Sequence, residues 1–153
     1  MTLVYEARRA APGGDRDDTL RFGRFGEGTA HLHVSARRSG DEPGLSSRFF
    51  NDLVREASRH DLALERTAVP VGMPTKFGVI ETADAAISST RGQRACIAFR
   101  HVSTLQPLRL TGWWCGTSER PADRAQLACL IDRFDLLSAG DDRPLRQLFA
   151  QAE

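Results

Sequence analysis

Residues 76–115 constrain the fold of this chain more than any other stretch, because they read as three consecutive β-strands joined by two short turns. Thr90, Arg91 and Gly92 suit a three-residue hairpin loop, in which Gly92 supplies the left-handed residue that such loops prefer. A second turn falls at residues 104–107. Together the two turns predict an antiparallel meander with a defined register.

That register predicts which residues face each other across the ladder. Glu81 faces His101 in the first hairpin, and Cys96 faces Cys115 in the second. Both hairpins gather apolar side chains on one face of the sheet, while Trp113 points to the other face. The apolar set is Phe77, Val79, Ala83, Ala85, Ile87, Ile97, Phe99, Leu110 and Trp114.

Flanking segments complete a mixed fold. An apolar stripe recurs at helical spacing in residues 47–60 and 121–137, and a short last helix is expected from residue 141 or 142. Residues 69–75 contain two prolines and a glycine and are expected to form a loop. We predict a single α+β domain over residues 1–153, a two-layer sandwich in which about three helices cover one face of a mostly antiparallel sheet of six or seven strands. The remaining strands are expected at residues 3–9, 19–25, 30–37 and 62–69.

Composition excludes some classes of function. The 21 basic and 20 acidic residues leave a formal charge of +1, so no electrostatic case for nucleic-acid binding arises. All but one of the basic residues are arginine, and they are spread along the chain among the acids. The chain contains no apolar run long enough to span a membrane and no signal-peptide region. The protein is therefore expected to be cytosolic, or else part of a longer precursor or membrane-anchored chain.

Glu81 and His101 are the leading catalytic candidates, because a carboxylate beside an imidazole can orient it and raise its pKa. Such a pair could serve as a general base in a small hydrolase-like enzyme. A structural cross-strand pair at the sheet edge is the simpler interpretation, since no nucleophile is identifiable next to it.

His31 and His33 lie two residues apart on the polar face of the strand at residues 30–37. Two histidines at this spacing occur in metal sites, but a site needs at least a third ligand. The pattern supplies none, so we favour exposed strand histidines over a metal-binding module. No metal and no cofactor is predicted.

Of the three disulfide pairings that three cysteines permit, we expect one of the two that involve Cys115, with Cys129 as its preferred partner. Cys115 could bond Cys129, which lies off the apolar stripe of the helix at residues 121–137, or it could bond Cys96 across the ladder. In a cytosolic protein all three would be buried thiols. No cysteine lies in a catalytic motif.

The face of the sheet opposite the helices is expected to be open and to carry a binding surface. Trp113 and Tyr5 would be aromatic anchors for a partner on this face. His31, His33 and Arg37 would add polar contacts from the alternating strand. The partner, a protein or a small molecule, is not identified by any motif.

The segments TKFGVIETAD, RACIAFR and GWWCGTSERPADRAQLACLIDRFDLLSAGDD resemble uncharacterised envelope proteins of Gram-negative bacteria over residues 75–150. The resemblance implies a soluble domain that follows a single membrane anchor, in an exported and oxidising setting that favours a disulfide. It implies no activity. It directs the localisation to the periplasm, with the cytoplasm as the alternative.

These observations predict a non-enzymatic binding or interaction domain of the bacterial envelope, acting through the open sheet face or the loop at residues 69–75. The two alternatives are the hydrolase built on Glu81 and His101 and the metal-binding module built on His31 and His33.

Overall fold

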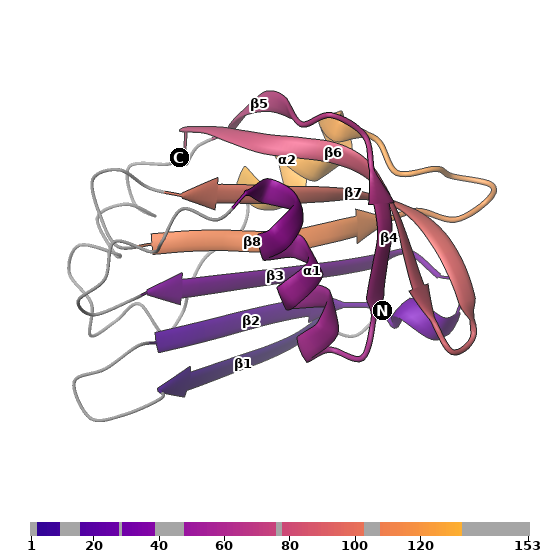
Figure 1. Ribbon diagram of the computed structural model, residues 1–153, viewed down its shortest axis with the longest axis horizontal. Coiled ribbons are helices and arrows are strands. Elements are labelled where there is room, and N and C mark those ends of the chain that lie inside the picture. Colours follow the sequence, from indigo (N-terminus) through magenta and orange to yellow (C-terminus); the bar gives the residue numbers. More distant parts are fainter. Residues whose placement is uncertain are drawn as a thin grey trace.

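The computed structural model describes residues 3–9, 16–27, 29–38, 48–75, 78–102 and 108–132. In these residues eight strands form one antiparallel sheet (Figure 1). The strands are β1 (Leu3–Arg9), β2 (Arg16–Phe22), β3 (His31–Arg38), β4 (Ala63–Thr67), β5 (Val71–Thr75), β6 (Gly78–Ser89), β7 (Gly92–Val102) and β8 (Leu108–Cys115).

The strand order is β1-β2-β3-β8-β7-β6-β4, and β5 also pairs with β6. The long strand β6 pairs with two short strands along the same edge. β5 pairs with its first half and β4 with its second half. The meander β6-β7-β8 that the sequence predicted therefore lies at the centre of the sheet, and β8 joins it to the N-terminal strands through β3.

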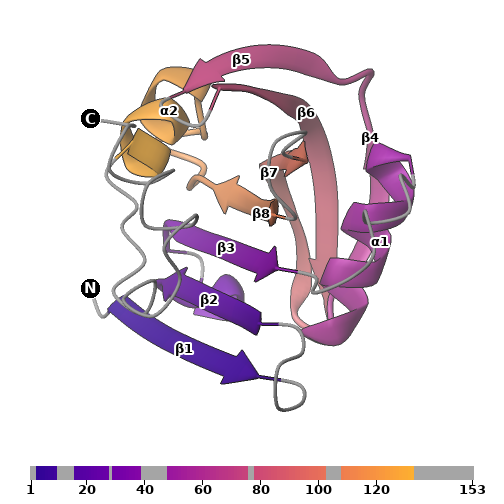
Figure 2. The same ribbon diagram turned by 90° about the vertical axis from the view of Figure 1, so that its left-hand side faces the viewer.

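The two α-helices of the described residues cover opposite faces of this sheet, as Figure 2 shows. The buried apolar side chains of α1 (Phe49–Arg59) pack in one cluster with Trp113 and with Ala83 and Ala85 of β6. Leu127 and Ile131 of α2 (Arg124–Asp132) pack in a second cluster with Trp114 and Phe99. A 3-10 turn, η1 (Phe25–Glu27), precedes β3.

The α+β class and the mostly antiparallel sheet are confirmed. The expectation that the helices share one face is wrong, since each apolar face of the central strands has its own helix. The α1 and α2 segments were predicted within a few residues. The short last helix lies outside the described residues, as does the turn at residues 104–107.

The first hairpin differs from its predicted register by one residue. Ser89 pairs with Gly92 around a two-residue turn, so Glu81 faces Arg100 instead of His101. A shift of one residue sends every side chain of a strand to the other face. Ala83, Ala85 and Ile87 consequently leave the face of Ile97 and Phe99 and pack under α1. The second hairpin has the predicted register.

The expected loop at residues 69–75 is also wrong, because most of it is strand β5. Pro74 is tolerated there since β5 is an edge strand that needs no donor on its outer side. Met73 is buried in the cluster beneath α2, which ties β5 to the core.

The disulfide joins Cys96 to Cys115 across β7 and β8, which was the alternative pairing. The preferred pairing of Cys115 with Cys129 is wrong, because Cys129 is an exposed free thiol on α2. Disulfides persist in oxidising compartments, so this bond favours a location outside the cytoplasm. Among the residues described, no helix is long and apolar enough to cross a membrane.

A polar cleft beneath the first helix

The buried face of α1 is half apolar and half acidic. Phe49, Leu53 and Ala57 pack on the sheet, and Asp52 and Glu56 are buried between them at helical spacing. Burying a carboxylate is costly unless positive groups or hydrogen-bond donors surround it. The sheet strands below α1 provide these groups.

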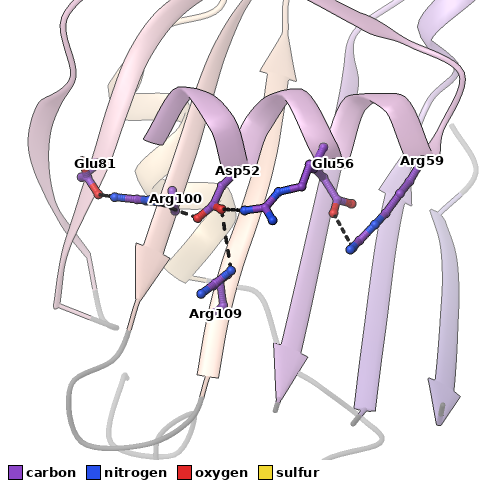
Figure 3. Close-up of polar contacts among 7 residues, drawn as sticks. Asp52, Glu56, Arg59, Glu81, Arg100 and Arg109 are labelled. Carbon is purple, nitrogen blue, oxygen red and sulfur yellow. Dashed lines mark hydrogen bonds and ion pairs between the residues drawn. The ribbon is translucent and has the colours of Figure 1, made fainter. Parts of the chain in front are cut away.

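The carboxylate of Asp52 forms ion pairs with three arginines, of which Arg100 and Arg109 are labelled in Figure 3. Its carboxylate lies 3.0 Å from the guanidinium of Arg100 on β7 and 3.7 Å from that of Arg109 on β8. Arg55, one turn along α1, donates a third contact at 2.6 Å. Arg100 also donates to Glu81, its partner across the ladder. Asp52 therefore joins α1 to β7 and β8, and Arg100 extends the network to β6 through Glu81.

Glu56 holds a second polar cluster one turn further along α1. His33 donates from Nε2 to Oε2 of Glu56 at 2.8 Å, and His60 donates to the same oxygen at 3.2 Å. Arg59 approaches the other oxygen, Oε1, at 3.5 Å (Figure 3). Burial alone would raise the pKa of Glu56, but the two histidine hydrogen bonds outweigh it and lower the pKa to about 2.

His33 is held rigidly at the base of this cluster. It comes from β3, is 1% exposed, and stacks on Trp113 of β8 with ring centroids 4.4 Å apart. Its ring also meets that of His60 edge to face at 4.3 Å. Burial lowers the pKa of His33, although the hydrogen bond to Glu56 opposes this shift.

A small cavity of about 60 Å³ opens between α1, β3 and β8 beside both carboxylates. Arg55 and Arg59 at its edge have side chains that are 60% and 44% exposed, so this edge faces solvent. Its lining residues are Ser35, Arg37, Asp52, Arg55, Glu56, Arg59, Arg109 and Thr111. Four guanidinium groups against two carboxylates give this lining a positive formal charge.

The predicted catalytic pair is not brought together. Glu81 binds Arg100 on the face covered by α1, whereas His101 pairs with Leu110 and lies on the α2 face. Alternate residues of a strand point to opposite faces, so the corrected register separates the two side chains. The hydrolase hypothesis therefore lacks the carboxylate–imidazole pair that would have served as its general base.

The expected open face is covered by α1. Trp113 is fully buried in the core instead of exposed as an anchor. His31 and His33 are also buried, and they do not combine as metal ligands, because the described cluster of possible ligand atoms around His33 does not include His31. His31 donates from Nδ1 to the carbonyl of Gly23. Burial lowers the pKa of His31 to about 4. Arg37 does line the cavity, and the side chain of Tyr5 lies outside what the structure describes.

Asp52, Glu56 and His60 were not identified as site residues from the sequence. A usable signal was present. Residues 49, 52, 53, 56, 57 and 60 follow the i, i+3, i+4 pattern of one buried helix face, and a glutamate four residues before a histidine places both on it.

No protein-family model matches this chain, and no significantly similar curated protein was found.

Proposed function

We propose that this chain is a non-enzymatic ligand-binding domain of the bacterial envelope, acting in the periplasm, and that it binds an anionic group in the cleft beneath α1. The observation that carries the proposal is the composition of the cleft, whose small cavity is lined by four arginines and two carboxylates. The buried disulfide supports the oxidising compartment.

The ligand chemistry follows from the size and the donors of the cavity. A cavity of about 60 Å³ that opens to solvent has room for a carboxylate, phosphate or sulfate group. Guanidinium groups match the geometry of these oxyanions, and the hydroxyls of Ser35 and Thr111 add neutral hydrogen-bonding groups. The rest of the ligand would lie outside, across the exposed arginines of α1.

Thermal unfolding in the presence of phosphate, sulfate or citrate tests this function, with sodium chloride at matched ionic strength as the control. A ligand present at about one hundred times its Kd stabilises the folded state by about 2.7 kcal/mol, so the midpoint rises with ligand concentration. We expect at least one of the three oxyanions to do this.

Arg37→Gln removes a guanidinium from the cavity lining and is expected to abolish this rise. Arg66→Gln, on an exposed residue of β4 that does not line the cavity, is the matched control. The proposal fails if none of the oxyanions stabilises the protein beyond the chloride control. It also fails if Arg37→Gln responds as the unsubstituted protein does.

A further inference from the structure

A second site adjoins this cleft. It is formed by three side chains, each of which offers one atom that could bind a metal ion. His33 and His60 contribute imidazole Nε2 atoms and Glu56 a carboxylate oxygen, and these three atoms all lie within 4.8 Å of one another. We propose that His33, Glu56 and His60 form a binding site for a divalent transition-metal ion, for which Zn²⁺ is the best-matched probe.

The ligand set suits the metal. Two imidazole nitrogens and one carboxylate oxygen are common zinc ligands, and three protein ligands leave a fourth position for water or a bound anion. Softer or larger ions are less well served, because the cluster contains no thiolate and too few oxygens for calcium.

The ligand atoms are close to the spacing of a tetrahedral site, and side-chain adjustment would complete it. In a tetrahedral site with bonds of about 2.0–2.1 Å, neighbouring ligand atoms are about 3.3 Å apart. The Nε2 atoms of His33 and His60 lie 2.8 and 3.2 Å from Oε2 of Glu56. An ion that replaces these two hydrogen bonds would lengthen both contacts by a few tenths of an ångström. The two imidazole nitrogens, which lie within 4.8 Å of each other, would have to approach to about 3.3 Å.

The surroundings hold the ligands in place. His33 is stacked on Trp113, and Glu56 and His60 are four residues apart at the end of one helix. Arg59 contacts the Glu56 oxygen that faces away from the histidines, which is the kind of outer contact that orients a ligating carboxylate. Glu56 lines the open cavity, so an ion can enter from solvent and its fourth position can face the cleft.

Zinc titration of the full chain in a buffer free of oxyanions tests the site independently of anion binding. After removal of bound metal with a chelator, we expect one Zn²⁺ per chain, measured by competition with a chromophoric chelator. The imidazole nitrogen resonances of His33 and His60 should shift on titration, while those of His31 and His101 stay in place.

His60→Gln and Glu56→Gln should each weaken zinc binding at least about tenfold. His101→Gln and Cys129→Ser are the controls and should bind as the unsubstituted protein does, since Cys129 is an exposed thiol that could capture zinc by itself. If Glu56→Gln fails to fold, His60→Gln still decides, because the His60 side chain is 26% exposed.

Three results would overturn the proposal. One is the absence of stoichiometric zinc binding. Another is unchanged affinity in His60→Gln. The third is loss of binding in Cys129→Ser, which would assign the ion to the surface thiol.

Discussion

Asp52 is the residue on which the attachment of α1 to the sheet depends most. It is 5% exposed, and the arginines that surround it come from α1, β7 and β8. Removing one member of a buried ion pair leaves the other charge without compensation, which is far more costly than breaking a pair in water.

Asp52→Asn is therefore expected to lower the free energy of unfolding by about 3 kcal/mol, the lower end of the usual range, because asparagine keeps the shape and one acceptor. Urea denaturation measures this loss. Asp84→Asn is the matched control, since Asp84 pairs with Arg124 but its side chain is 71% exposed, and it should cost less than about 1 kcal/mol. Equal losses in the two variants would contradict the buried network.

His101 gives the protein a pH dependence that can be isolated. Burial lowers its pKa below the ordinary value of 6.5. As the pH falls below 6.5, the unfolded chain binds a proton at this residue before the folded protein does, so stability is full above pH 6.5 and is lost below it. Urea denaturation of the metal-free protein at pH 7.5 and 5.5 should show a smaller loss in His101→Gln than in the unsubstituted protein. The same loss in both would show that His101 titrates alike in the folded and unfolded states.

At the scale of elements, the pairing of β3 with β8 requires a glycine at position 112. A Cβ atom added there would lie 1.9 Å from the carbonyl oxygen of His33 and 2.7 Å from the ring of Phe99. The His33 carbonyl belongs to the backbone and cannot move away as a flexible side chain can, so β3 and β8 would have to separate.

Gly112→Ala is expected to destabilise the protein by about 3 kcal/mol, the upper end for an overpacked core. Hydrogen exchange should also be faster at the amides of β3 and β8. Gly72→Ala is a matched control within a strand, because its Cβ would meet only the exposed side chain of Val79, which can move away. A cost for Gly112→Ala no greater than for Gly72→Ala would argue against this close approach.

The same elements show what the sequence reveals and what it conceals. Alternation and helical stripes identify most strands and both described helices, and the pairing of Phe99 with Gly112 follows from the second turn. The first turn is ambiguous, because Thr90, Arg91 and Gly92 fit loops of two or three residues, and the choice decides which face every side chain of β6 occupies. Local sequence does not contain that information, since long-range packing selects between the two registers.

The site is harder to predict than the fold, for a related reason. Asp52 and Glu56 resemble ordinary surface acids until the arginines and His33 of distant strands are known to lie beneath α1. Whether a charged residue in a helix faces water or a polar core depends on its partners across the fold, and the spacing alone does not identify them.

At the scale of the whole molecule, the disulfide connects stability to compartment. Cys96 and Cys115 are buried in the cluster under α1, next to Trp113, and they close a loop with a sequence separation of 19. A bond that closes a loop of this size stabilises a protein by about 3 kcal/mol, largely by restricting the unfolded chain. The folded protein is expected to depend on oxidising conditions.

Counting thiols in denatured, unreduced protein tests this dependence. We expect one reactive thiol, Cys129, when the protein is produced in an oxidising compartment and three after reduction. Replacement of Cys96 and Cys115 by serine together should lower the urea midpoint by the equivalent of about 3 kcal/mol, while Cys129→Ser leaves it unchanged. Three free thiols in protein from an oxidising compartment, or a peptide that links Cys129 to Cys115, would refute the observed pairing. Three free thiols would also remove the main support for a location outside the cytoplasm, because the rest of the described chain carries no comparable mark of its compartment.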